Sequence, residues 1–263
     1  LGAWAATGLA SFWLPPGLPA EVVLPALCLG GMVAGAAWGA VPGALRALAG
    51  TSEILVSLML VYVAVQFNAY FVNAPWSEAG FQMTPRFPDA ACLPGLDAVL
   101  GGWIDLRGGQ AHVGLFVALL LAAATWVVLE RTRLGYELTV LGASRDTAAY
   151  AGIPVRRLTI GVMAASGALA GLAGAIEVSG VVHRLQENFT GGAGFTGILI
   201  AWIARLHAGG VVLAAVLFGG LLVGAREVQP AGVGTLLQGV VLLVLIAAEA
   251  GLRYRIERVE VTR

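Results

Sequence analysis

The sequence GGMVAGAAWG, residues 30–39, repeats glycine every four residues in the middle of an apolar run. The sequence SGALAGLAGA, residues 166–175, has a closely similar spacing. Glycines four residues apart share one face of a helix, and in lipid such a face lets two helix backbones pack closely. The two stretches predict either tight packing inside one chain or an interface between two subunits. The glycines concerned are Gly31, Gly35, Gly39, Gly167, Gly171 and Gly174.

The composition of the whole chain is that of a membrane protein. Of its 263 residues, 59% are hydrophobic and 11% are charged, whereas a soluble domain has about 25% charged residues. Several apolar runs are candidate transmembrane helices, because about 20 apolar residues cross a hydrocarbon core of about 30 Å. They cover residues 2–14, 20–42, 53–72, 111–129, 160–178, 193–204, 210–225 and 233–249.

The predicted fold is an all-α polytopic transmembrane bundle, surrounded by membrane lipid and forming a single domain, residues 1–263. The runs 193–204 and 210–225 are short, since helices of that length rise only about 18 to 24 Å. We therefore expect them to be half-helices or re-entrant segments. The chain begins at Leu1 inside an apolar stretch without a signal-peptide pattern, so we also expect it to lack one or more natural N-terminal spans.

The charged and reactive residues exclude several functions. All 15 basic residues are arginine, and without lysine the chain has neither a GxxxxGK[ST] phosphate loop nor a Schiff-base amine. The net charge of zero argues against a nucleic-acid partner. Cys28 and Cys92 look unpaired and have no metal-ligand neighbours at useful spacing. We therefore expect no catalytic residue, no metal site and no cofactor bound by this chain.

The positions of the arginines predict the orientation of the chain, because cytoplasmic loops carry more positive charge than the loops outside. Placing the segment 130–159 in the cytoplasm puts most arginines inside. The inside set is Arg46, Arg131, Arg133, Arg145, Arg156, Arg157, Arg205, Arg253, Arg255, Arg258 and Arg263, and the outside set is Arg86, Arg107, Arg184 and Arg226. The loop 73–110 then lies outside and, with its prolines, is typical of a surface loop or small cap. Its acidic residues are Glu78, Asp89, Asp97 and Asp105.

The cytoplasmic segment 130–159 contains the signals of one short helix. Ser144 can cap the N-terminus of a helix, and Gly152 followed by Pro154 can end it. The predicted helix, Arg145 to Ala151, stands isolated between arginine-rich flanks and is too short to be stable alone in water, so something must pack against it. Two interpretations remain open. The helix caps the ends of the flanking spans, or a separate protein docks on it at the cytoplasmic face.

Polar side chains inside the apolar runs are candidate solute contacts, because burying them in lipid is costly. The amides of Gln66 and Asn68 could bind a sugar hydroxyl or a base edge, or could instead hydrogen-bond to another helix. Glu177, near the outer end of its run, is either a site residue or a surface carboxylate. Phe195 and Thr196 belong to the short run 193–204, where an aromatic ring could stack on a nucleobase or a sugar.

Three long blocks of the sequence carry a family resemblance. RTRLGYELTVLGASRDTAAYAGIPVRR at residues 131–157 is followed by SGALAGLAGAIEVSG at 166–180 and GGAGFTGILIAWIARLHAGGVVLAAVLFGGL at 191–221. Together with GALRALAGTSEILVSLMLVYVA at residues 43–64, these blocks resemble the permease subunits of bacterial ABC importers for nucleosides and simple sugars. That group belongs with the branched-chain amino acid and ribose permeases.

The resemblance implies a multi-pass permease of the bacterial plasma (inner) membrane. It implies two cytoplasmic ABC ATPase subunits that use ATP and Mg, a second permease subunit, identical or paralogous, and an extracytoplasmic substrate-binding protein. It also implies that the region GAGFTGI is a short helix near the translocation path, and that the short cytoplasmic helix is the coupling helix. The implied coupling residues are Ser144, Arg145, Asp146, Ala148, Ala149, Tyr150, Gly152 and Ile153.

Two other classes of function compete with an importer permease. An ion-coupled secondary transporter of a small polar solute needs a carboxylate or a broken-helix ion site near the middle of the membrane. The candidate glutamates instead lie at the ends of the apolar runs: Glu53, Glu130, Glu177 and Glu249. A membrane enzyme is disfavoured, because the sequence has no GxSG serine motif and no HExxH pair.

Overall fold

The computed structural model describes residues 1–15, 17–78, 80–96, 111–187, 189, 191–226 and 233–253. Its regular structure is helical, as predicted. The chain divides into two compact units. Unit 1 contains Leu1–Leu121 and Val127–Gly191, and unit 2 contains Ala122–Trp126 and the described residues from Gly192 onward. The charged residues Asp97, Asp105, Arg107, Arg255, Arg258 and Arg263 lie outside the described part of the chain.

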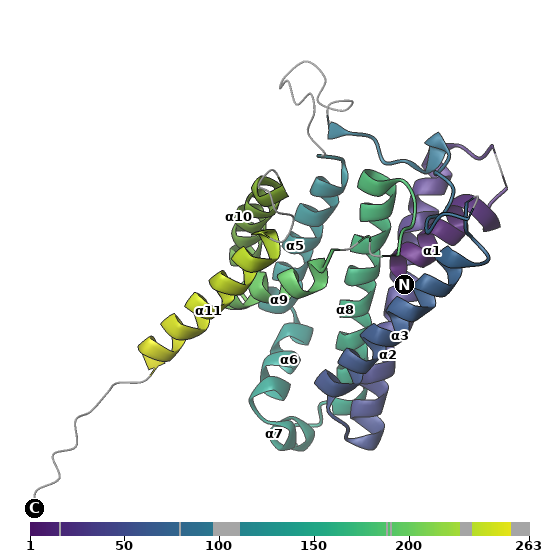
Figure 1. Cartoon of the computed structure of the whole chain (residues 1–263). Coiled ribbons are helices and arrows are strands. Elements are labelled where there is room, and N and C mark those ends of the chain that lie inside the picture. The colour runs from purple at the N-terminus through teal and green to yellow at the C-terminus, as the bar shows by residue number, and fades with distance from the viewer. Residues whose placement is uncertain are drawn as a thin grey trace, which may run out of the picture. The chain divides into compact units, whose positions relative to one another are not determined.

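Unit 1 is a helical bundle (Figure 1). Its elements are α1 (Gly2–Gly8), the π-helix η1 (Leu9–Trp13), α2 (Ala20–Ala49), α3 (Glu53–Asn73), the 3-10 helix η2 (Asp89–Ala91), α5 (Gly114–Arg131), α6 (Arg133–Ala143), α7 (Arg145–Tyr150), α8 (Val155–Glu177) and the π-helix η3 (Val178–Val182). Residues Ala122–Trp126 of α5 group with unit 2. Among the described residues, four helices are long and apolar enough to cross a membrane: α2, α3, α5, and α8 continued by η3.

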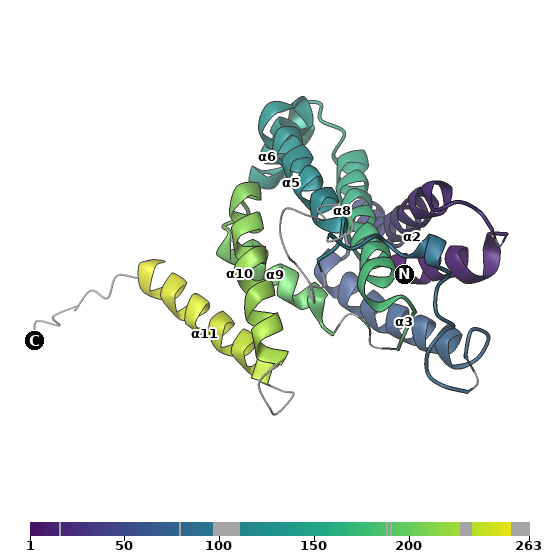
Figure 2. The same ribbon diagram turned by 90° about the horizontal axis from the view of Figure 1, so that it is seen from above.

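The glycine faces of α2 and α8 pack against each other inside unit 1 (Figures 1 and 2). A Cβ atom on Gly39 would lie 2.5 Å from Met163 O and 2.9 Å from Gly167 Cα. One on Gly35 would lie 2.8 Å from Gly171 Cα. These distances leave no room for a side chain, so the close approach of the two backbones requires glycine. Packing within one chain, the first of the two predicted alternatives, is confirmed.

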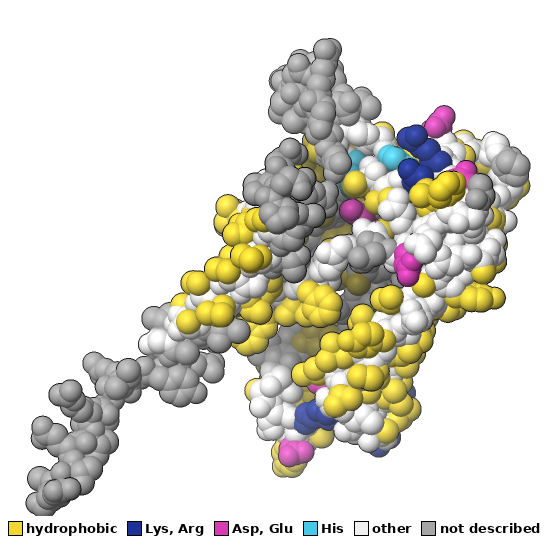
Figure 3. Space-filling view, viewed as in Figure 1, with side chains coloured by type: hydrophobic (Ala, Val, Ile, Leu, Met, Phe, Trp, Pro, Cys, Tyr) yellow, Lys and Arg dark blue, Asp and Glu magenta, His cyan; other side chains and the backbone are white. Residues whose placement is uncertain are grey.

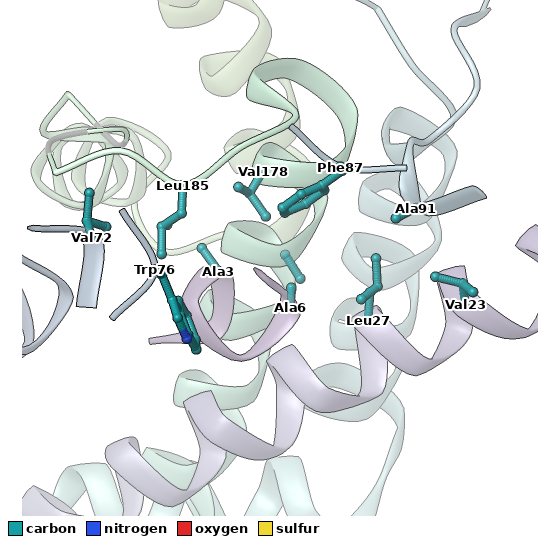
Figure 4. Packing of buried hydrophobic residues seen from close by; sticks show 11 residues of the cluster. Ala3, Ala6, Val23, Leu27, Val72, Trp76, Phe87, Ala91, Val178 and Leu185 are labelled. Carbon is teal, nitrogen blue, oxygen red and sulfur yellow. The ribbon is translucent and has the colours of Figure 1, made fainter. Parts of the chain in front are cut away.

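The buried core of unit 1 lies where α1, α2 and η3 meet the end of α3 and the loop that follows it (Figure 4). Its members are Ala3, Ala6, Val23, Leu27, Val72, Trp76, Phe87, Ala91, Ala175, Val178 and Leu185. Backbone hydrogen bonds tie the loop to the chain after α8: Thr84 N–H donates to Leu185 O at 3.0 Å, and Phe87 N–H donates to His183 O at 2.9 Å. The described part of the loop 73–110 is therefore a small packed cap, the second of the two forms that the sequence suggested.

The two ends of unit 1 carry different charges. Helices α2 and α8 run antiparallel, since Gly43 lies beside Ile160 whereas Gly31 lies beside Ala175. The end opposite the cap carries Arg46, Arg131, Arg133, Arg145, Arg156 and Arg157, and the cap end carries Arg86 and Arg184. On the face shown in Figure 3, hydrophobic side chains cover much of the stretch between these ends. Within unit 1, the arginines are segregated in the way that the predicted orientation requires.

The basic segment contains two helices, so the prediction of one isolated helix was wrong. Thr132 has an extended backbone, with φ −115° and ψ 162°, and so interrupts the helix between α5 and α6. A Cβ atom on Gly135 would collide with the carbonyl oxygen of Leu129, so the tight bend requires glycine there. The sequence contains the spacing of an amphipathic helix, i, i+4 and i+7, in its leucines Leu134, Leu138 and Leu141.

Unit 2 contains α9 (Ala193–Ile203), α10 (Ala208–Arg226) and α11 (Val233–Arg253). Helix α9 has 11 residues and rises about 16 Å, which confirms that it is too short to cross a membrane alone. Helix α10 has 19 residues and begins earlier than the predicted run 210–225. Arg205 and Leu206 take left-handed conformations, with φ 50° and 60°, and this tight turn brings Gly209 and Gly210 into the helix.

Candidate functional site

The short helix α7 is capped at both ends by the residues that the sequence singles out. The Ser144 hydroxyl accepts a hydrogen bond from Thr147 N–H at 3.3 Å, which satisfies one of the free donors of the first turn. Asp146 lies in that turn, where the helix dipole favours its charge. At the other end Gly152 has φ 77°, a conformation that costs glycine little. The predicted capping residues are confirmed, and the helix ends at Tyr150, one residue before the predicted Ala151.

Helix α7 has a buried side and a displayed side. Ala148 is fully buried, and its carbonyl oxygen accepts a hydrogen bond from Ile153 N–H at 3.0 Å. Helices α6 and α8 pack against α7. Tyr150 is 97% exposed, and the other exposed coupling residues are Arg145, Asp146, Ala149 and Gly152. The helix therefore packs on the flanking helices with Ala148 buried and leaves a polar and aromatic surface exposed.

The two amides of α3 have different surroundings. Asn68 donates from Nδ2 to the carbonyl oxygens of Gln186 at 3.2 Å and Glu187 at 3.3 Å. This side chain ties α3 to the segment that follows η3. Gln66 is exposed and, within the part of the chain that the structure describes, has no hydrogen-bond partner. Of the two, only Gln66 presents an open amide.

Glu177 is half-buried as the last residue of α8, at the cap end of unit 1. Its carboxylate interacts electrostatically with the imidazole of His112. The Nδ1 atom of His112 accepts a hydrogen bond from Gly114 N–H at 3.1 Å. Burial lowers the pKa of His112, the Glu177 carboxylate opposes that shift, and His183 adds to it. The carboxylate is thus placed where α8 meets the cap, near the imidazole of His112.

In unit 2 the candidate residues of α9 point in different directions. Thr196 is 5% exposed, and its hydroxyl accepts a hydrogen bond from Gln238 Nε2 at 3.1 Å. This bond joins α9 to α11. Phe195 is 59% exposed. Sequence reasoning missed Gln238, although a polar side chain in an apolar run is the signal that identified Gln66.

The described residues hold no group of three or more His, Cys, Asp or Glu side chains that could bind a metal ion. Both cysteines are free thiols. The candidate solute contacts are the amides of Gln66 and Asn68, the carboxylate of Glu177, the ring of Phe195 and the hydroxyl of Thr196. The structure shows a short capped helix at the arginine-rich end of unit 1 and an open amide on α3.

Comparison with known families gives a match over residues 1–247 to the model described as branched-chain amino acid transport system / permease component. The glucose ABC transporter permease protein TsgB13 of Haloferax volcanii is 37% identical, covering 97% of this chain and 69% of the relative. The guanosine ABC transporter permease protein NupP of Bacillus subtilis is 33% identical, covering 87% of this chain and 65% of the relative.

A more distant relative is the ribose import permease protein RbsC of Escherichia coli K12, which is 28% identical over 68% of this chain and 50% of its own length. The chain thus spans between half and about two thirds of the length of these relatives. No solved structure matches the chain.

Proposed function

The chain belongs to the family of permease components of branched-chain amino acid transport systems. We infer that it carries a nucleoside or a simple sugar through the membrane as part of an ATP-driven importer. It is a multi-pass membrane protein of the ABC permease type, and permeases of this type are not themselves enzymes. The observation that carries the inference is the similarity to sugar and nucleoside permeases along nearly the whole chain.

The proposed solute class is supported by the names of the relatives, which are permeases for glucose, guanosine and ribose. These solutes are all neutral and rich in hydroxyl groups. Their chemistry matches the open groups of this chain, an amide at Gln66 and an exposed ring at Phe195, because an amide binds hydroxyls and base edges and a ring stacks on flat faces.

In the proposed mechanism α7 is the coupling helix on which an ATPase subunit docks. Its exposed Tyr150 offers the kind of aromatic anchor that is common at protein interfaces. Because α7 is fixed at Ala148 and packs on α8, a force applied to its displayed side would be transmitted to α8 and, through the glycine face, to α2. ATP and Mg would be used by the partner ATPase, since this chain has no lysine for a phosphate-binding loop.

The proposed partners are those of an ABC importer permease, the type to which the family model and the relatives point. Two ATPase subunits would lie at the arginine-rich end of unit 1, and a substrate-binding protein would lie at the cap end. A second permease subunit would complete the path across the membrane.

Reconstitution tests the proposed function directly. The full-length permease, its ATPase and its binding protein are placed in lipid vesicles, and uptake of radiolabelled glucose or guanosine is measured with and without ATP. We expect uptake only when ATP and all partners are present. Uptake that persists without ATP and collapses with an ionophore would instead indicate an ion-coupled transporter, an alternative that the family assignment does not support.

A further inference from the structure

The exposed side of α3 carries uncharged polar side chains in the middle of an apolar helix. Tyr62 is 69% exposed, Tyr70 is 64% exposed, and Gln66 between them is also exposed. Their four-residue spacing places all three along one side of the helix. We call these three residues the α3 polar row. The exposed valines Val61, Val63 and Val65 border it.

The polar row lies at a depth where lipid would surround it. Helix α3 has 21 residues and rises about 31 Å, which matches a hydrocarbon core of about 30 Å. Gln66 stands three residues beyond Val63, the middle residue of the helix, and so about 5 Å from the midplane. None of the residues in the most apolar 18-residue stretch of α3 is buried. In Figures 1 and 2 α3 lies beside α2, the helix on which it packs.

The polar groups of the row have no partner among the described residues. The amide of Gln66 could form four hydrogen bonds and each tyrosine hydroxyl could form further ones. Asn68, two residues from Gln66, donates its Nδ2 hydrogens to the carbonyls of Gln186 and Glu187. An unpaired amide facing hydrocarbon is costly, and polar side chains in transmembrane helices face protein or water instead.

We propose that the α3 polar row lines the water-filled solute path and contacts the solute directly. This rests on the proposed function and narrows its solute class. Between Glu53 and the end of α3 at Asn73 the helix carries no charged side chain. The row therefore offers an amide, two hydroxyls and two aromatic faces to a neutral hydroxylated ring compound. It offers no ion pair to the ammonium or carboxylate group of an amino acid.

Thiol labelling of the assembled transporter tests the row. The chain has only two cysteines, Cys28 and Cys92, so Cys28→Ala with Cys92→Ser provides a background without thiols. Gln66→Cys and Tyr62→Cys are then compared with Val61→Cys, an exposed position at similar depth on another side of α3. The probe is a membrane-impermeant methanethiosulfonate, applied to vesicles that hold the permease with its partners.

We expect the thiols at positions 66 and 62 to be labelled about ten times faster than the thiol at position 61. We also expect glucose or guanosine, but not leucine, to slow labelling at position 66. Equal rates at positions 66 and 61 would overturn the proposal. So would disulfide cross-linking of position 66 between two permease copies without labelling, which would make the row a subunit interface. Labelling that neither glucose nor guanosine slows would overturn the solute contact.

ATP-driven uptake by the cysteine-free background distinguishes this failure from failure of the proposed function. If uptake requires ATP but position 66 resists labelling, the inference about the row is wrong and the proposed function stands. If the same vesicles show no ATP-driven uptake of either solute, the proposed function itself fails.

Discussion

At the residue scale, the glycines on the facing sides of α2 and α8 set how closely these helices approach. Without a hydrophobic force between helices in lipid, the contact depends on van der Waals packing along the whole shared face. A single added side chain separates the backbones and weakens every contact above and below it. The glycines of this face are therefore more sensitive to substitution than glycines of the same helices that face open space.

We predict that Gly35→Leu destabilises the folded permease by about 3 kcal/mol, the upper range for overpacking a well-packed core. Its Cβ atom would meet backbone atoms of Gly167 and Gly171. Thermal unfolding in detergent measures the loss. Gly161→Leu is the matched control, because nothing lies within 4 Å of its Cβ position on α8. A similar loss in both variants would contradict the role assigned to the glycine face.

His112 lies just outside the membrane-spanning part of α5. Burial lowers its pKa, so the folded chain binds a proton at this site less readily than the unfolded chain. The stability that the neutral imidazole contributes is present above its ordinary value of about 6.5 and is lost as the pH falls below it. Protonation would also cost the hydrogen bond that Nδ1 accepts from Gly114 N–H.

We expect the melting temperature of the wild-type chain to fall between about pH 8 and about pH 5, the range in which histidine changes charge. His112→Asn keeps an acceptor at a similar position without titrating, so its melting temperature should depend less on pH. An equal pH dependence in the two proteins would exclude His112 as the source.

At the element scale, α7 is a helix of six residues that owes its order to its caps and to its neighbours. Ser144 satisfies one of the free donors of its first turn, and Ala148 is buried against the bundle. The remaining side chains contribute little to the fold because they face solvent. This division lets the displayed side be altered without unfolding the permease.

Tyr150→Ala should leave the melting temperature of the permease unchanged, because the side chain is 97% exposed. Loss of an aromatic anchor at an interface should weaken ATPase docking about tenfold. The measurement is stimulation of the partner's ATP hydrolysis as permease concentration is varied. Tyr136→Ala on α6, where the ring is also exposed, is the control. Docking that Tyr150→Ala leaves unchanged would place the docking surface outside α7, and an equal loss in both variants would extend it to α6.

At the scale of the whole molecule, the charges at the two ends of unit 1 predict its orientation in the membrane. In a background without Cys28 and Cys92, Glu187→Cys introduces a thiol at the cap end and Arg156→Cys introduces one at the opposite end. Both native side chains are exposed. We expect a membrane-impermeant maleimide to label the first in intact cells and the second only after permeabilisation. The reverse pattern would invert the proposed topology.

The sequence by itself determined the features that depend on local chemistry. The length of an apolar run sets whether a helix can cross lipid, so α2, α3, α5 and α8 could be predicted. Ser144 and Gly152 define the ends of α7 because each acts on backbone groups within a few residues. The leucine spacing of α6 is local as well, so this helix too was predictable from the sequence.

Only the tertiary structure decided which groups meet across the chain. The glycine spacing was equally compatible with an internal contact and a subunit interface. The antiparallel packing of α2 on α8 shows that the glycines make the internal contact. Gln66 and Asn68 are equivalent in the sequence, yet Asn68 is tied to a segment more than a hundred residues away while Gln66 stays open. The physical reason is that a side chain's role depends on which distant backbone the packed helices bring within hydrogen-bonding distance, and spacing along one helix does not contain that information.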